Sequence, residues 1–433
     1  MLLNPVLISV VVLCSLCLMK LNVLMSLILS ALCGAMLAGI PIPQAMTILC
    51  DGFGANAGTA LAYIFLGAFA SAVARTGLAD MMSKKLSRVV GKNTVLLLLA
   101  LTGVACLSQN LIPVHIAFIP IMVPPLLSLF NEMNLDRRGV ACALAFGLKA
   151  PYICVPFGFG MIFMKIISDN LLANGMDAPL SAVASVNWIL GLAMFAGLLI
   201  AVMVTYRKPR RYNAAEADMS AAQAALDTMT RAHAVTLVAV VVVVAVQVMA
   251  ESLALSALCG VLVMILGGAI RFDEIDECFA SGMRIMGMIA MIMLVAGGYA
   301  EVMKATGAVN ALVEAAVTVM GGSKWIAAVI ITLIGLLVTM GIGSSFSTVP
   351  VLAVLYVPLC QRMGFSVPAT ILLMSAAAAL GDAGSPASDT TLGPTSGLNA
   401  DGQHDHIWDT CVPTFLHFNI PLMIVSIVVA QFI

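Results

Sequence analysis

Long apolar runs, separated by short polar segments, recur along the whole chain and constrain its fold more than any other feature. The first of them fall at about 5–19, 23–41, 58–75, 94–107 and 113–130. In a bilayer core every backbone polar group must be satisfied inside the protein, so such runs form α-helices there. Only 9% of the 433 residues are charged, whereas soluble domains carry about 25%. The sequence therefore predicts an all-α polytopic membrane protein with roughly a dozen crossings of ~20 residues each.

The same composition excludes several classes of function. No stripe of Lys and Arg exists to bind nucleic acid, so none is expected as a partner. GFGANAG at 52–58 lacks the spacing of a dinucleotide-binding loop, and no GxxxxGK[ST] loop is present for ATP. Cys14 and Cys17 form a CxxC within an apolar run and are interpreted as packing residues. We expect neither an enzyme nor a cofactor, and no bound metal beyond a possible Na⁺.

The chain also carries an internal duplication. LSALCG occurs at 29–34 and again at 255–260, and other matches follow at nearly the same offset. They pair ASAVARTG (70–77) with AEVMKATG (300–307), IMVPPL (121–126) with VLYVPL (354–359), and Pro156 with Pro386. A series of ordered matches at nearly constant spacing indicates two repeats of the size found in transporters. The predicted units are a first transmembrane repeat, 1–206, a cytoplasmic linker, 207–231, and a second transmembrane repeat, 232–433.

The basic residues predict the orientation of the two repeats. If the chain starts outside, the basic segments at Lys20, 75–92, 136–138 and 207–211 all fall on the cytoplasmic side, as membrane proteins prefer. That assignment gives the first repeat an odd number of crossings. The second repeat is therefore predicted to have the inverted topology.

Two polar breaks interrupt the apolar runs of each repeat. SQNLIPVH (108–115) is matched by GIGSSFSTVP (341–350), and KAPYICVPFGFG (149–160) is matched by GDAGSPASDT (381–390). In a bilayer such breaks survive only when they are buried in protein or line a wet cavity. Their half-helix ends expose carbonyls that suit a cation and N–H groups that suit a carboxylate. We expect the four breaks to meet near the midplane and form an ion and substrate site.

The predicted binding residues are the polar side chains of these breaks, whose hard oxygen ligands suit Na⁺ or release a proton. They are Asp382, Asp389, Ser385, Ser388, Thr390, Ser344, Ser345, Ser347, Thr348, Ser108, Gln109, Asn110, Lys149 and His115. Asp382 and Asp389 are expected to converge on one cavity, and Lys149 to hold a cation position or to counter Asp382.

Structural interpretations of the same residues stay open. Asp389 with Thr390 could cap a half-helix, and Asp382 could be an ordinary turn residue. The hydroxyl groups could bond within their own helices. Lys149 could extend toward the membrane surface, and His115 could be a packed core histidine.

The segment GDAGSPASDTTLGPTSGLNADGQHDHIWDTCVPTFLHFNIPL (381–422) resembles the C-terminal signature of the NhaC-like Na⁺/H⁺ antiporter family of the ion transporter superfamily. The likeness extends over nearly the whole chain and is closest to the branch of amino-acid permeases. It implies two inverted repeats, each with a re-entrant hairpin or helix pair and a broken helix. The hairpins would be 94–130 and 323–361, with SQN and GSSFST at their tips. It also implies a scaffold domain that often dimerises, so a homodimer is expected.

Together these features predict a secondary active transporter, coupled to Na⁺ or H⁺, in the cytoplasmic (inner) membrane of a prokaryote. The leading function is Na⁺/H⁺ antiport, and the alternative is a Na⁺- or H⁺-coupled amino-acid permease. The expected partners are a small ion or small-molecule substrate and the lipid bilayer. A purely structural membrane subunit would have no need of the duplicated breaks.

Overall fold

A computed structural model of the chain describes residues 4–19, 21–78, 93–110, 118–156, 159–213, 229–250, 252–308, 322–342 and 345–433. Every regular element within these residues is a helix. The all-α prediction is therefore confirmed.

The first part of the chain contains ten of these elements and one helical extension. They are α1 (Pro5–Leu18), α2 (Val23–Leu37), α3 (Ile42–Asp51), the 3₁₀ turn η1 (Gly52–Asn56), α4 (Ala57–Arg75), α6 (Thr94–Asn110), α7 (Phe118–Glu132), α8 (Arg137–Cys154), α9 (Phe159–Ala173), α10 (Leu180–Ile200) and its π-helical extension η3 (Ala201–Thr205). Helix α3 ends at Asp51. Pro43 near the start of α3 lacks an N–H group that the first helical turn would leave unpaired in any case, so it favours a helix start there.

The second part repeats this order with one clear difference. Its elements are α12 (Arg231–Ala250), α13 (Leu253–Leu266), η4 (Phe272–Glu274), α14 (Ile275–Ala305), α16 (Lys324–Ile342), α17 (Ser345–Arg362), α18 (Val367–Ala379), α19 (Asp389–Leu398), η5 (His406–Cys411), α20 (Val412–Thr414), η6 (Phe415–Asn419) and α21 (Ile420–Val429). Helix α14 runs without a break for 31 residues, whereas α3, η1 and α4 divide the matching stretch.

Polar caps define where several helices begin. The side-chain oxygen of Asn22 accepts hydrogen bonds from the backbone N–H groups of Leu24 and Met25 at the start of α2. Asp136 caps α8 by accepting from Arg138 N, and Ser366 caps α18 by accepting from Ala369 N. These bonds satisfy N–H groups that have no partner inside the helix.

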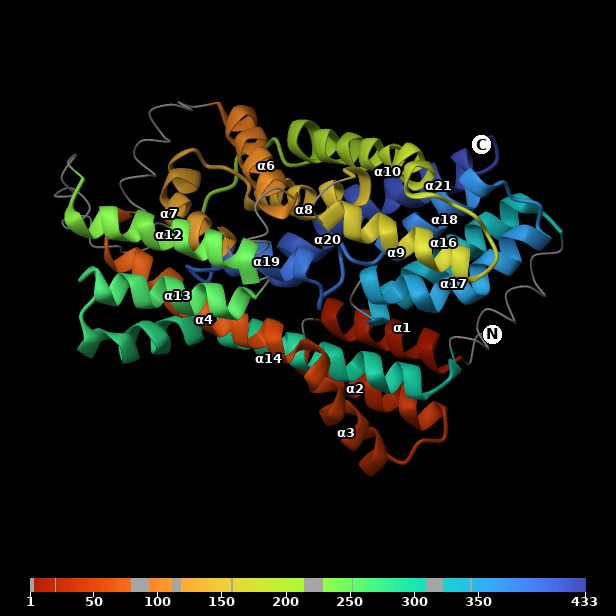
Figure 1. Cartoon of the computed structure of the whole chain (residues 1–433), viewed down its shortest axis with the longest axis horizontal. Helices are drawn as coiled ribbons and strands as arrows, with labels where there is room; N and C mark the ends of the chain where they lie inside the picture. Colours follow the sequence, from red (N-terminus) through yellow and green to blue (C-terminus); the bar gives the residue numbers. More distant parts are fainter. Residues whose placement is uncertain are drawn as a thin grey trace.

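Figure 1 shows two bands of helices. One band contains α1–α4 and α12–α14, with α4 and α14 packed side by side along its length. The other contains α6–α10 and α16–α21, and the interrupted helices α8–α9 and α18–α19 lie within it. The candidate site residues fall mostly in this second band.

Tight helix contacts recur in pairs separated by 230 residues. A Cβ on Gly147 would lie 2.2 Å from Ala105 Cβ, and one on Gly335 would lie 2.3 Å from Ala377 Cβ. Adding 230 to the first pair, 105 and 147, gives the second, 335 and 377. Only glycine permits this close approach. In the first contact the glycine is the later residue of the pair, and in the second it is the earlier one.

The same spacing appears where η1 and α4 pack against α14. A Cβ on Gly52 would lie 2.7 Å from Gly298 Cα, and one on Gly282 would lie 2.3 Å from Ala68 N. Positions 52 and 282, and 68 and 298, again differ by 230. Reciprocal packing extends to whole helices, since α2 contacts α14 and α13 contacts α4.

Among the described residues, three helices are long and apolar enough to cross a bilayer by length and composition. They are Leu180–Thr205, Met286–Ala305 and His406–Val429, and eight shorter apolar helices of 10–17 residues accompany them. The exact number of crossings, and the choice between hairpins and full spans at 94–130 and 323–361, stay predictions.

Candidate functional site

The second polar break lies between α18 and α19. Helix α18 ends at Ala379, and α19 begins at Asp389 with Ser388 as its N-cap. Gly381 and Gly384 have φ angles of 86° and 88°, a region that L side chains rarely adopt. A Cβ on Gly381 would also lie 2.8 Å from Met340 N. These glycines let the chain turn inside the protein and carry Asp382 between the two half-helices.

Asp382 is the centre of a hydroxyl cluster. Its carboxylate accepts hydrogen bonds from four hydroxyl groups: Tyr152 at 2.6 Å, Ser388 at 2.5 Å, Ser345 at 3.3 Å and Thr390 at 3.3 Å. The residue is 7% exposed, and all four donors are buried. The Tyr152 and Ser345 oxygens also lie 2.9 Å apart, so Ser345 can give its one proton either to Tyr152 or to Asp382. The sequence predicted Ser345, Ser388 and Thr390 at this site, and the structure brings all three to one carboxylate.

Lys149 approaches this cluster from α8. Its side chain is fully buried, so it does not extend to the surface of the protein. Its Nζ donates to Asn419 Oδ1 at 3.4 Å, and the Asn419 amide in turn donates to the carbonyl of Ala383, next to Asp382. Through Asn419 and Ala383 the Lys149 ammonium is linked to the backbone next to Asp382. That Lys149 counters Asp382 stays a prediction.

The first break is shorter than expected. The sequence placed it at 149–160, yet α8 continues through Lys149 and Pro151 to Cys154. Pro151 removes the bond that its own N–H would make to the Gly147 carbonyl, and α8 ends three residues after it. The consequence is that Lys149 and Tyr152 project from a regular helix, one turn apart, toward the opposite break.

Asp389 belongs to a separate contact. Its Oδ1 accepts a hydrogen bond from the Tyr63 hydroxyl at 2.9 Å, and Tyr63 comes from α4 in the other band. Ser388, rather than Asp389, caps α19, since Ser388 Oγ accepts from Thr390 N at 3.1 Å. The recorded bonds of Asp382 and Asp389 thus go to different partners, and their convergence on one cavity stays a prediction.

The other predicted residues divide into three groups. Ser385 and Thr348 are fully buried, and Ser385 Oγ accepts from Ala387 N within the break. Ser108, Gln109 and Asn110 end α6, and Ser347 lies in α17, but the structure describes only their backbone. Ser344 and His115 lie outside the described residues.

Sequence reasoning missed three residues that build the cluster or its edge: Tyr152, Asn419 and Tyr63. A signal for Tyr152 was present, because the offset that pairs Pro156 with Pro386 also pairs Tyr152 with Asp382. No comparable signal identifies Tyr63 or Asn419, since each comes from a helix outside the breaks.

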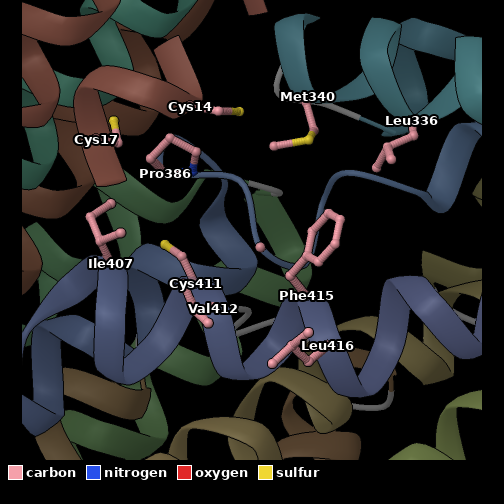
Figure 2. Close-up of a pocket in the computed structure, with 11 residues that line it drawn as sticks. Cys14, Cys17, Leu336, Met340, Pro386, Ile407, Cys411, Val412, Phe415 and Leu416 are labelled. Atoms are coloured by element: carbon pink, nitrogen blue, oxygen red, sulfur yellow. The ribbon is translucent and has the colours of Figure 1, made fainter. Parts of the chain in front are cut away.

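An apolar cavity of about 300 Å³ lies on one side of the second break. Figure 2 shows Cys411 and Phe415 rising from the C-terminal helical segment toward Pro386 and Met340. The cavity is lined by Cys14, Cys17, Leu336, Met340, Gly384, Pro386, Ile407, Cys411, Val412, Phe415 and Leu416. Cys14 and Cys17 therefore face a cavity next to the break as well as packing in α1.

A second, more polar cavity of about 410 Å³ lies at the other end of α19. It is lined by Asn22, Val23, Arg284, Met288, Ile292, Leu392, Thr395, Ser396, Asn399, Ala400 and His406. His406 separates the two cavities, because its Nε2 lies 2.9 Å from the Pro386 carbonyl and its Nδ1 lies 2.8 Å from Thr395 Oγ1.

A charged network joins the start of α8 to the loop after α19. The fully buried Arg137 donates to both carboxylate oxygens of Asp401, at 2.7 and 2.5 Å, and to the carbonyl of Leu398. Its guanidinium also lies 4.2 Å from the centre of the Tyr212 ring. Burial raises the pKa of Asp401, but the hydrogen bonds and charge of Arg137 outweigh this, and the net pKa is below its ordinary value.

Comparison with known sequences identifies the family. The sequence model of the Na⁺/H⁺ antiporter family matches residues 143–430, which include both breaks of the Asp382 cluster. The chain belongs to the Na⁺/H⁺ antiporter family. A second model, also described as a Na⁺-H⁺ antiporter family, matches residues 4–90. The chain is therefore a membrane transport protein and not an enzyme.

Two curated relatives resemble the chain along most of its length. An uncharacterized membrane protein of Vibrio parahaemolyticus is 46% identical over 99% of both chains. A protein of Bacillus subtilis named "Putative amino acid transporter YuiF" is 46% identical over 86% of this chain and 87% of its own. Among solved structures, the YdaH transporter of Alcanivorax borkumensis is 12% identical, with a TM-score of 0.43, over 89% of this chain and 87% of its own. This last similarity is too distant to carry an argument.

Proposed function

We propose that the chain is a secondary active transporter of the cytoplasmic membrane that uses the Asp382 cluster as its coupling site for Na⁺ or H⁺. One observation carries the proposal. A buried carboxylate is surrounded by four hydroxyl groups, and no ion pair within 4 Å of it is recorded among the described residues. Each hydroxyl both donates and accepts hydrogen bonds, so the same groups can stabilise a bare carboxylate or turn their oxygens to a cation.

The leading mode is Na⁺/H⁺ antiport. Protonation of Asp382 and occupancy by Na⁺ both neutralise the one carboxylate, and each therefore excludes the other. Lys149 adds a nearby positive charge that keeps the ion-free state from holding a lone buried anion. The family assignment agrees with this mode.

The second candidate is Na⁺- or H⁺-coupled transport of an amino acid. The name of the Bacillus relative supports it. The polar cavity beside His406, which an exchanger of small cations would not require, supports it as well.

We further propose that the two halves form inverted repeats related by a pseudo-two-fold axis. The contacts Gly52–Gly298 and Gly282–Ala68 support this, because they join the two halves reciprocally and a two-fold axis generates one from the other. Tyr152 and Asp382 differ by the same 230 positions and bond directly. A residue can contact its own repeat mate only near the axis, so the coupling site would lie on it.

The proposal is tested with purified protein in liposomes that contain a pH-sensitive dye. Addition of Na⁺ alone should change the internal pH if antiport is correct. A pH or Na⁺ flux that appears only with an added amino acid would support the second candidate. No cation-dependent flux under any of these conditions would refute both.

A further inference from the structure

The polar cavity at the C-terminal end of α19 has the chemistry of a ligand site. Arg284 of α14 contributes its one formal positive charge. No ion pair of Arg284 is recorded in the part of the chain that the structure describes, and its side chain is exposed to the cavity side of α14. An unpaired guanidinium with five N–H donors is suited to bind a carboxylate.

The amide groups in the wall add further donors. Asn22 Oδ1 already accepts from Leu24 N and Met25 N, and Asn399 Oδ1 accepts from His404 N. These bonds fix the amide orientation, so the NH₂ groups are what remain for a ligand. Asn22 also caps α2, a helix of 15 residues whose N-terminal end carries partial positive charge.

The opposite wall has the complementary polarity. Thr395 and Ser396 lie in the last turn of α19 and Asn399 is its C-cap, at the end where the helix dipole is negative. Ser396 Oγ donates its proton to the Gly393 carbonyl, so only its lone pairs remain to accept. This side of the cavity can hold an ammonium group.

We propose that this cavity binds a small zwitterion, with its carboxylate on Arg284 and the two amides and its ammonium at the C-terminal end of α19. The inference deepens the second candidate function and rests on it for its role in transport. A ten-residue helix spans about 15 Å, so the cavity and the Asp382 cluster lie at opposite ends of α19. Ligand binding at one end and ion binding at the other would then act on the same half-helix.

The test uses the purified full-length chain and measures binding calorimetrically. Each of the twenty common amino acids is tried as a probe, and any that binds is compared with its methyl ester, which lacks the carboxylate, and its deaminated acid, which lacks the ammonium. Arg284→Gln should weaken binding about 10- to 100-fold, the loss expected for a charged hydrogen bond. Arg284→Lys should recover part of the binding affinity.

Arg271→Gln serves as the matched control, because Arg271 pairs with Asp273 at an exposed site and does not line the cavity. It should leave binding unchanged. Absence of binding by every amino acid, equal binding of an ester, or an unaltered Kd in Arg284→Gln would overturn the inference. Asp382→Asn distinguishes a failure of this inference from a failure of the coupling proposal. This variant should retain zwitterion binding while losing ion-coupled flux.

Discussion

The two interrupted helices face each other with opposite chemistry. Helix α8, in the first half, presents a lysine and a tyrosine, both donors: Lys149 and Tyr152. The second break presents the acceptor Asp382 with Ser388 and Thr390 around it. Duplication supplies two similar scaffolds, and divergence of a few side chains makes one a donor and the other an acceptor. The buried carboxylate of Asp382 then accepts hydrogen bonds from residues of both halves.

The largest effect is expected from removing the acceptor. Asp382→Asn keeps the size of the side chain but cannot bind or release a proton or neutralise a cation. We expect coupled flux in liposomes to fall to background, while expression and helical content remain. Asp273→Asn, at an exposed ion pair, is the control. Wild-type coupling in Asp382→Asn would reject the coupling site.

A large effect on stability is expected where the two halves are joined by Arg137 and Asp401. Asp401→Asn would leave a fully buried guanidinium without its charged partner, at a cost of about 3 kcal/mol. Thermal unfolding of the detergent-purified protein measures it. An unchanged Tm would show that the neutral partners of Arg137 suffice.

The pH dependence of the Arg137–Asp401 pair follows from the direction in which the pKa of Asp401 is shifted. The pKa of Asp401 is lower in the folded protein than in the unfolded chain, whose value is about 3.9. Its stabilising contribution is therefore complete above the unfolded pKa and is lost as the pH falls through the folded pKa. Asp401→Asn should flatten the loss of stability below about pH 4; an identical acid limb in both proteins would contradict this.

An intermediate effect is expected from the donor side. Lys149→Gln removes a positive charge that competes with Na⁺ for Asp382, so the apparent Na⁺ affinity should rise on the order of 10-fold, which corresponds to about 1.4 kcal/mol of interaction. The Na⁺ dependence of flux measures it, with Lys304→Gln at an exposed ion pair as control. A weaker Na⁺ affinity would mean that Lys149 organises the site instead.

The smallest effect is expected at Asp389. Its recorded partner is the Tyr63 hydroxyl, which can donate to an amide oxygen as well as to a carboxylate. Asp389→Asn keeps this acceptor, so it should reduce the flux by less than Asp382→Asn does. A complete loss of coupling, equal to that of Asp382→Asn, would restore the view that both carboxylates act in one cavity.

Much of the architecture could be predicted from local patterns. Apolar runs gave the helices, and glycine and proline gave the break before Asp389, because both act on the backbone near their own positions. Helix boundaries were harder to predict, since α8 continues through Pro151 to Cys154 and shortens the first break. Only one intrahelical bond is lost at Pro151, and tertiary packing outweighs that loss.

The sequence by itself determined that this chain is a duplicated helical membrane protein with polar breaks, since hydrocarbon requires backbone satisfaction within each helix. It also named Asp382 and three of its hydroxyl neighbours. Only the tertiary structure decided that Tyr152 donates to Asp382, Lys149 to Asn419 and Tyr63 to Asp389. Those contacts join residues 230 to 326 positions apart, and which side chains meet at such separations depends on how the helices pack, which no local pattern encodes.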